Sequence, residues 1–170
     1  RIPKIIHYFW FGGNAIPYDF KKNIESWHKF CPDYEIRLWN EDNYDVEKNC
    51  YMKQAYQAKK WGFVPDYARL DVINKYGGIY LDVDVELVKP LDDLRYFELY
   101  CGFESKKSVN FGQGFGSACN SIILDEMMRA YDNIKFINDD GSLNLTPSPA
   151  YQTKVLQDHG LILNGKTQGT

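Results

Sequence analysis

Two aspartates, Asp82 and Asp84, have the type and spacing most suggestive of chemistry in this chain. They end the run Gly-Gly-Ile-Tyr-Leu-Asp-Val-Asp, in which a glycine pair leads into a short apolar segment. In an extended backbone, side chains two positions apart project from the same face, about 6.5–7 Å apart along the strand. Such carboxylates suit Mg²⁺ or Mn²⁺, which prefer oxygen ligands and often sit between a carboxylate and a substrate phosphate. The spacing predicts a divalent-cation site at the end of a strand, although a solvated strand end has the same pattern.

A second pair of charged residues, Asp66 and Arg69, lies one predicted helix before the aspartates. Their spacing of three places them on one helix face. Asp66 falls in the first turn, where a carboxylate favours the positive end of the helix dipole, so a purely structural ion pair is one interpretation. The functional interpretation is that Asp66 accepts hydrogen bonds from sugar hydroxyls. Arg69 would then steady a negatively charged leaving group, because its planar donors engage two phosphate oxygens at once.

The elements that must position these residues alternate between strand and helix. Short apolar runs that end at glycine or polar loops alternate with segments of helical spacing that open or close at proline. Such alternation indicates an α/β fold with a mainly parallel sheet flanked by helices. The pattern predicts strands at Lys4–Phe11, Glu35–Trp39, up to Asp82 with an extension over Glu86–Lys89, Leu99–Phe103 and Gly114–Ser117, and helices from Pro17 to Pro32, Tyr51–Lys60, Pro65–Tyr76, Ile122–Tyr131 and Tyr151–Gln157.

Length, charge and cysteine usage narrow the class of protein. A chain of 170 residues is long enough for one domain, residues 1–170. The net charge of −3 provides no electrostatic footprint for nucleic acid. No apolar run approaches the ~20 residues that a membrane span needs. The four cysteines are scattered without a Cys-x-x-Cys pair, which favours thiols in a reducing compartment and hence a cytoplasmic location. The start at Arg1 and the polar end suggest that C-terminal residues, including part of the site, are missing.

Three ordered motifs resemble one known family. They are Ile-Pro-Lys-Ile-Ile-His-Tyr-Phe-Trp from Ile2 to Trp10, Asp-Tyr-Ala-Arg-Leu from Asp66 to Leu70, and Tyr-Gly-Gly-Ile-Tyr-Leu-Asp-Val-Asp from Tyr76 to Asp84. Together they resemble the DXD-motif glycosyltransferase sugar-binding region. This is the family of bacterial capsular and surface-polysaccharide transferases and of Och1-type yeast mannosyltransferases, glycosyltransferase family 32, with the clostridial glucosylating toxins as more distant members.

The resemblance implies a Rossmann-like GT-A fold, a UDP- or GDP-sugar donor, a glycan acceptor, Mn²⁺ or Mg²⁺ as cofactor, and retention of anomeric configuration. One departure is Pro65, where the family usually has a small serine, so any donor contact made by that hydroxyl is lost. The family's later segment with His and Trp is not visible before Thr170. The implied roles are stacking on the donor base for Trp10, gripping of the donor sugar and diphosphate for Asp66 and Arg69, a donor-site contact for Tyr80, contacts to ribose and sugar for Asp82, and metal binding for Asp84.

Two alternatives to a glycosyltransferase stay open at this stage. Leu-Asp-Val-Asp-Val also fits the signature of haloacid-dehalogenase-type phosphohydrolases, with Asp82 as nucleophile and Asp84 as acid and base. Asp139 and Asp140 would then imitate that family's later acidic pair, although the signature normally opens the fold and here follows about eighty residues. The other alternative is a nucleotide-sugar-binding remnant without catalysis.

Overall fold

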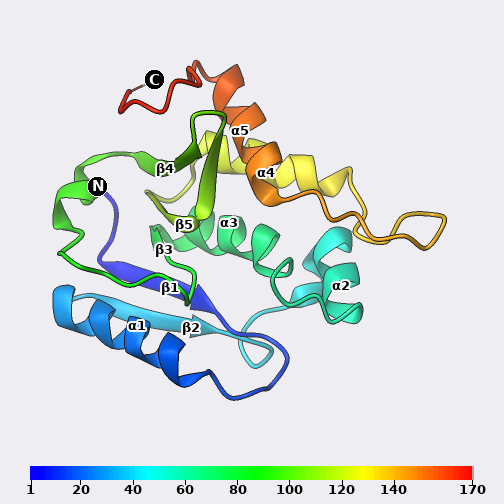
Figure 1. The fold of residues 1–170 in the computed structure, drawn as a ribbon, viewed down its shortest axis with the longest axis horizontal. Helices are drawn as coiled ribbons and strands as arrows, with labels where there is room; N and C mark the ends of the chain where they lie inside the picture. Colours follow the sequence, from blue (N-terminus) through cyan, green and yellow to red (C-terminus); the bar gives the residue numbers. More distant parts are fainter. Residues whose placement is uncertain (170) are drawn as a thin grey trace.

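A computed structural model describes residues 1–169 of the chain, which form a five-stranded sheet with helices on both faces (Figure 1). The strand order is β2-β1-β3-β5-β4. β1 pairs in parallel with β2 and β3, whereas β5 runs antiparallel to both β3 and β4. The strands are β1 (Ile5–Phe9), β2 (Glu35–Trp39), β3 (Gly78–Tyr80), β4 (Leu99–Ser105) and β5 (Ser108–Ser117), and the helices are α1 (Tyr18–Phe30), α2 (Cys50–Gln57), α3 (Pro65–Tyr76), α4 (Ile122–Asp132) and α5 (Ser148–Asp158), with short 3₁₀ turns at Val46–Lys48 and Asp92–Tyr96.

The predicted α/β class is confirmed, and most elements lie where the sequence pattern places them. β2 and α3 have the predicted bounds. β3 is shorter than expected and ends at Tyr80, and the predicted extension over Glu86–Lys89 is wrong, because that segment forms no strand. α5 begins three residues before the predicted Tyr151, at Ser148.

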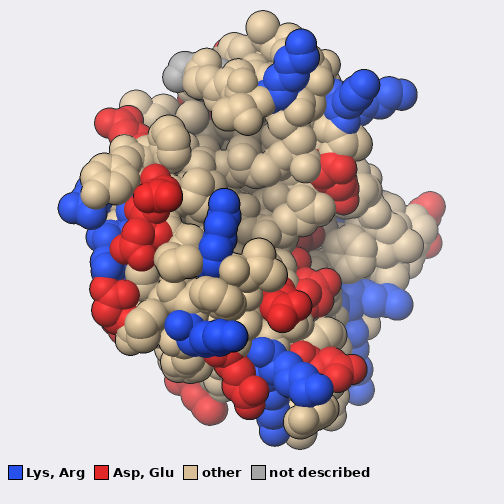
Figure 2. All heavy atoms as spheres, turned by 60° about the vertical axis from the view of Figure 1, so that its left-hand side comes forward, with Lys and Arg blue, Asp and Glu red and all other residues tan. Residues whose placement is uncertain are grey.

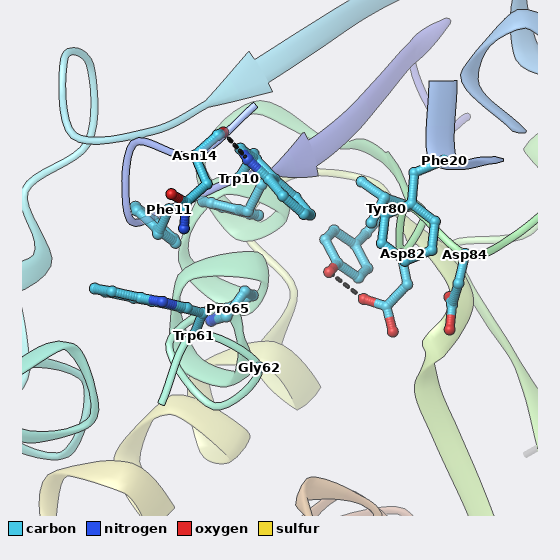
Figure 3. A pocket seen from close by; sticks show the side chains of 12 residues that line it. Trp10, Phe11, Asn14, Phe20, Trp61, Gly62, Pro65, Tyr80, Asp82 and Asp84 are labelled. Atoms are coloured by element: carbon cyan, nitrogen blue, oxygen red, sulfur yellow. Dashed lines mark hydrogen bonds between the residues drawn. The ribbon is translucent and has the colours of Figure 1, made fainter. Parts of the chain in front are cut away.

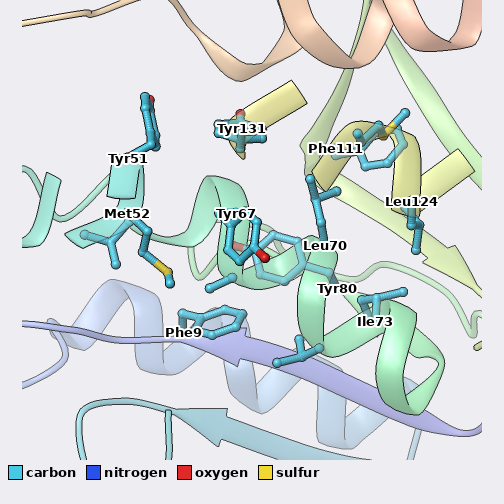
Figure 4. Packing of buried hydrophobic residues seen from close by; sticks show 14 of the residues in the cluster. Phe9, Tyr51, Met52, Tyr67, Leu70, Ile73, Tyr80, Phe111, Leu124 and Tyr131 are labelled. Carbon is cyan, nitrogen blue, oxygen red and sulfur yellow. The ribbon is translucent and has the colours of Figure 1, made fainter. Parts of the chain in front are cut away.

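The core lies in two layers, one on each face of the sheet. β1 contributes side chains to both layers. Ile6 and Tyr8 pack toward α1 while Phe9 faces the opposite side, as the two-residue period of a strand requires. The larger cluster joins the sheet to α2, α3 and α4 (Figure 4). α3 lies in the middle of this layer, where even its charged residues Asp66 and Arg69 are buried. The fold therefore holds this helix rigidly against the end of β3.

A glycine at position 77 makes the connection from α3 to β3 possible. Gly77 has a φ of +66°, and its N–H donates to the Ile73 carbonyl at 2.8 Å, which closes the helix. A Cβ at this position would lie 2.8 Å from the Pro3 ring. The glycine pair thus turns the chain directly from α3 into β3 and toward the aspartates.

His7 is a core residue of β1. Its ring is fully buried, Nδ1 accepts a hydrogen bond from Trp39 Nε1 at 3.0 Å, and Nε2 lies 2.9 Å from the Gly77 carbonyl oxygen. Because the indole N–H can only donate, the neutral ring carries its proton on Nε2. Burial lowers the pKa of His7 to about 4. His7 therefore fastens β1 to the α3–β3 turn.

The surface carries both signs of charge. Figure 2 shows Lys and Arg interspersed with Asp and Glu on one face, without a continuous basic stripe. No helix among residues 1–169 is both long enough and apolar enough to cross a membrane.

Candidate active site

The two aspartates of the motif lie in a turn that directly follows β3. The Asp82 N–H donates to the Gly112 carbonyl at 3.3 Å, and the Val85 N–H donates to the Asp82 carbonyl at 3.0 Å. The predicted extended backbone through Asp84 is therefore wrong, because this second hydrogen bond curls the chain. Both carboxylates nevertheless line one pocket and point the same way in Figure 3. Asp82 is partly buried and Asp84 is exposed.

Asp82 is held between a tyrosine and an arginine. The buried Tyr80 hydroxyl donates to Asp82 Oδ1, and Arg69 Nη1 lies 3.8 Å from the same oxygen. Burial raises the pKa of Asp82 and the neighbouring Asp84 adds to that rise, whereas Arg69 and the Tyr80 hydroxyl oppose it. One oxygen of Asp82 is thus fixed by the protein. A cation close to Asp82 and Asp84 would relieve the repulsion between them.

Asp66 and Arg69 form a buried ion pair beside this turn. Arg69 Nη2 lies 2.6 Å from Asp66 Oδ1, and the two side chains are 4% and 8% exposed, respectively. Burial raises the pKa of Asp66 to about 6, against the opposing effect of Arg69. The predicted ion pair between Asp66 and Arg69 within one helix is therefore present. Because Arg69 also faces Asp82, the pair belongs to the site as well.

Two pockets meet at Asp82. The first has a volume of about 380 Å³, and half of the residues that line it are aromatic (Figure 3). The second, of about 250 Å³, is mainly polar. Gly62 and Asp82 line both pockets, so the carboxylate stands where they adjoin. The first is lined by Phe9, Trp10, Phe11, Asn14, Phe20, Trp61, Gly62, Pro65, Tyr80, Asp82, Val83 and Asp84, and the second by Gly62, Phe63, Asp66, Arg69, Asp82, Glu104, Asn110, Gly112, Pro147, Ser148 and Pro149.

Trp10 lies in the wall of the aromatic pocket, just beyond the end of β1. Its Nε1 donates to the Asn14 carbonyl at 2.6 Å, and its ring meets Phe20 edge-on at 6.0 Å between centroids. Trp61 lines the same pocket and packs so closely on Gly12 that a Cβ there would lie 2.7 Å from the indole. The pocket therefore offers two indoles, of which the sequence analysis singled out only Trp10.

The polar pocket contains residues that the sequence analysis did not identify. Asn110 Oδ1 accepts from the Gly112 N–H at 2.8 Å, its Nδ2 donates to Glu104 at 3.1 Å, and Ser148 accepts from Arg69 Nη2 at 2.7 Å. In the sequence, the glycine-rich stretch from Gly112 to Gly116 is the feature that could have pointed to this pocket. A Cβ on Gly112 would lie 2.6 Å from Asp82 Oδ2 and 3.3 Å from Arg69 Nη1, so this glycine keeps the space beside the carboxylate open.

Four of the five charged side chains that line the two pockets are acidic, which matters for a metal: Asp66, Asp82, Asp84 and Glu104, against Arg69. Within residues 1–169, no group of three or more His, Cys, Asp or Glu side chains is arranged to hold a metal ion. Asp82 and Asp84 would therefore supply two ligands at most, with water and a ligand phosphate completing the shell. Such a donor set suits Mg²⁺ or Mn²⁺, which commonly bind through one or two carboxylates plus substrate phosphates.

The acidic pair that the phosphohydrolase alternative requires lies elsewhere. Asp139 and Asp140 are exposed in a turn, where Asp139 pairs with Lys135 at 2.8 Å and Asp140 accepts from Ser142. Neither residue lines the two pockets around Asp82. The structure therefore gives the phosphohydrolase interpretation no second pair of carboxylates at this site.

The fold is of the GT-A type, and it presents paired carboxylates between an aromatic and a polar pocket. The solved structure titled "PaToxG Glycosyltransferase" superposes with a TM-score of 0.71 at 19% identity, and the match covers 94% of this chain and 69% of that one. Residues 17–100 match the family model "Glycosyltransferase sugar-binding region containing DXD motif". The match confirms the resemblance to this glycosyltransferase family that the motifs carry.

Two of the proteins similar to this chain come from a virus and a fission yeast. "Uncharacterized glycosyltransferase L373" of Acanthamoeba polyphaga mimivirus is 27% identical over 169 residues, which is 92% of this chain and 64% of that protein. "Inositol phosphoceramide mannosyltransferase 3" of Schizosaccharomyces pombe is 34% identical over 117 residues, which is 64% of this chain and 32% of that protein. The chain thus spans less than two thirds of the length of either relative.

Proposed function

We propose that residues 1–170 form a single catalytic domain that transfers a sugar from a UDP- or GDP-sugar to a saccharide or surface-polysaccharide acceptor, with retention of anomeric configuration and dependence on Mn²⁺ or Mg²⁺. The observation that carries the proposal is the position of Asp82. It stands where an aromatic pocket and a polar pocket adjoin, next to Asp84 and facing the Arg69 guanidinium at 3.8 Å. A nucleotide sugar has the same three parts in order: a flat base, a charged diphosphate and a polar sugar.

Each part of the donor finds matching chemistry. The base would stack on the indole ring of Trp10, because that ring offers a flat face in the wall of the aromatic pocket. The diphosphate would lie near Asp84 and Asp82, which would hold the divalent cation. The sugar would occupy the polar pocket, where Asp66 can accept hydrogen bonds from its hydroxyls beside Arg69.

The mechanism follows from where charge develops. When the bond between the anomeric carbon and phosphate breaks, the nucleoside diphosphate leaves with negative charge and the sugar becomes oxocarbenium-like. A divalent cation, when bound, neutralises part of the charge on the departing diphosphate. Arg69 is preorganised for the same task, because its guanidinium is buried and anchored before any donor arrives.

Retention would follow from attack on the face that the phosphate leaves. Asp66 is already paired with Arg69, and Asp82 is bound to Tyr80, so neither is a free nucleophile for a covalent intermediate. We therefore favour front-face attack, in which the leaving phosphate takes the proton of the acceptor hydroxyl. The free thiols of Cys31, Cys50, Cys101 and Cys119 favour the cytoplasmic location that we include in the proposal.

A thermal-shift screen of UDP- and GDP-sugars with and without Mn²⁺ tests the proposal, because a ligand that binds the folded state raises Tm by mass action. We expect a shift with one nucleotide family that requires the metal, followed by release of the nucleoside diphosphate and a glycosidic product. A binding-only remnant would show the shift without the product. Robust turnover of para-nitrophenyl phosphate would instead support the phosphohydrolase and contradict the proposal.

A further inference from the structure

The first residue of α5 reaches the buried ion pair at the centre of the site. The Ser148 hydroxyl accepts a hydrogen bond from Arg69 Nη2 at 2.7 Å, although 79 residues separate them in the sequence. Ser148 is only 6% exposed and lines the polar pocket. The Ser148 hydroxyl also opposes the rise that burial causes in the pKa of the Asp66 carboxyl. Asp66 and Ser148 are therefore joined through a single nitrogen of Arg69.

The position of Ser148 does not depend on Arg69. Two other side chains of α5 bind the backbone of β5: Gln152 accepts from the Phe111 N–H at 3.1 Å, and Thr153 accepts from the Val109 N–H at 3.0 Å. Both bonds are buried. The helix is thereby fixed on the sheet, and its first turn is brought to the rim of the polar pocket. Ser148 is a fixed point against which Arg69 can be held.

The contacts of Arg69 are unevenly distributed over its guanidinium. Nη2 binds both Asp66 and Ser148, Nη1 faces Asp82 at 3.8 Å, and the buried Nε has no partner among the described residues. Two acceptors on Nη2 fix the rotation of the planar group, because the guanidinium presents its donors in a rigid fork. In this orientation Nη1 faces Asp82. Gly112 lies beside both groups, and because it has no side chain the space next to them stays open.

We propose that Ser148 is a positioning residue for transfer: it orients the Arg69 guanidinium so that Nη1 faces Asp82 and the diphosphate, while Asp66 stays turned toward the sugar. The proposal rests on the function proposed above. Ser148 itself makes and breaks no bond. Without its hydroxyl, a buried N–H of Arg69 would lack an acceptor, and the guanidinium would rotate or draw in water.

Three variants separate positioning from a merely structural role. Ser148→Ala removes the hydroxyl, and Ser148→Thr keeps it. Ser121→Ala is the matched control, because Ser121 caps α4 by accepting from the Leu124 N–H and has no contact with Arg69. The probes are UDP-glucose and GDP-mannose with Mn²⁺, and the readout is release of UDP or GDP. We expect kcat to fall about tenfold in Ser148→Ala, with a smaller change in KM, because Arg69 acts mainly on charge that develops in the transition state.

We expect Ser148→Thr to recover most of the kcat that Ser148→Ala loses. Ser121→Ala should keep the kcat of the unmodified protein although its Tm is lower. An unchanged kcat in Ser148→Ala would overturn the proposal. Equal falls in kcat in Ser148→Ala and Ser148→Thr, in proportion to the falls in their Tm, would also overturn it. If the unmodified chain releases no nucleotide from either probe, the proposed function fails for these donors, and ¹⁵N NMR of the arginine side chains then decides the role of Ser148. Separate, slowly exchanging Nη signals for Arg69 that collapse only in Ser148→Ala support positioning, whereas unchanged signals contradict it.

Discussion

The Arg69 guanidinium on α3 faces the Asp82 carboxylate after β3, with 3.8 Å between Nη1 and Oδ1. The two residues come from separate elements, joined by the Gly77 turn. Arg69 is buried, whereas the Asp82 side chain is 39% exposed, so the arginine provides a fixed charge at the boundary of the pocket.

Gly112→Ala should block the polar pocket without unfolding the protein. The added Cβ would lie 2.6 Å from Asp82 Oδ2 and 3.0 Å from Asn110 Oδ1, so the carboxylate must move. We expect nucleotide-sugar binding to weaken by at least about tenfold, while binding of the free nucleoside diphosphate changes less. Isothermal titration calorimetry with UDP- and GDP-sugars measures both.

Gly102→Ala is the matched control on the neighbouring strand β4, because a Cβ there meets nothing within 4 Å. It should bind the sugars like the unmodified protein. Equal sugar affinity in the Gly112→Ala and Gly102→Ala proteins would show that the polar pocket does not hold the sugar.

Tyr80→Phe should weaken activity through Asp82 rather than through packing. The substitution keeps the buried ring but removes the hydroxyl that donates to Asp82 Oδ1. A lost hydrogen bond to a charged group corresponds to about 1.5–3 kcal/mol, or about tenfold or more in rate. Tyr131→Phe is the control, because the buried Tyr131 hydroxyl has no partner among the described residues. Nucleotide release that is slowed in Tyr131→Phe and unchanged in Tyr80→Phe would contradict this assignment.

The pH dependence of stability should reveal His7 and Asp66 acting in opposite directions. The pKa of His7 is lowered to about 4, so below pH 6.5 the unfolded state binds the proton first and stability falls by about 2 kcal/mol between pH 7 and 5. The pKa of Asp66 is raised to about 6, so the folded state binds its proton first and stability rises by about 1 kcal/mol over the same interval.

Urea denaturation at pH 7 and pH 5 separates the two contributions. In the unmodified protein the gain from Asp66 should offset about half of the loss from His7. In Asp66→Asn only the His7 contribution remains, so the loss of stability on acidification should be larger than in the unmodified chain. An identical loss in both proteins would mean that Asp66 does not titrate in this range.

Local sequence patterns predict the helix and strand that hold the motif residues, but contacts between distant segments determine which other residues line the site. Pro65 and Gly77 bound α3 by local chemistry, and helical spacing alone places Asp66 and Arg69 on one face. The i, i+4 spacing of a helix would pair Asp71 with Lys75, yet Asp71 binds Lys48 at 3.0 Å and Tyr44 at 2.7 Å. No pattern within one helix can reveal a partner that folds in from an earlier loop.

The same limit applies to the motif turn and to α5. The turn after Asp82 depends on hydrogen bonds to Gly112 and Val85, so the extended spacing of the two aspartates was a reasonable but incorrect inference. Ser148 meets Arg69 only because α5 binds the backbone of β5. Its residue type is ordinary at a helix start, so the sequence carries no sign of this contact.

Asp84→Asn tests the metal assignment with little effect on folding. Asp84 is exposed and should contribute less than about 0.5 kcal/mol to stability. Asp93→Asn is the control, since Asp93 is also exposed and lies in the 3₁₀ turn Asp92–Tyr96, away from both pockets. Metal-dependent transfer should be abolished in the first variant and intact in the second.

The most direct measurement is Mn²⁺ binding followed by electron paramagnetic resonance in the presence of UDP or GDP. If Asp82 and Asp84 hold a cation against a diphosphate, the unmodified protein and Asp93→Asn should bind Mn²⁺ together with the nucleotide, and Asp84→Asn should lose at least tenfold in that affinity. Mn²⁺ affinity and turnover in Asp84→Asn equal to those of the unmodified protein, at the same metal concentration, would contradict the account.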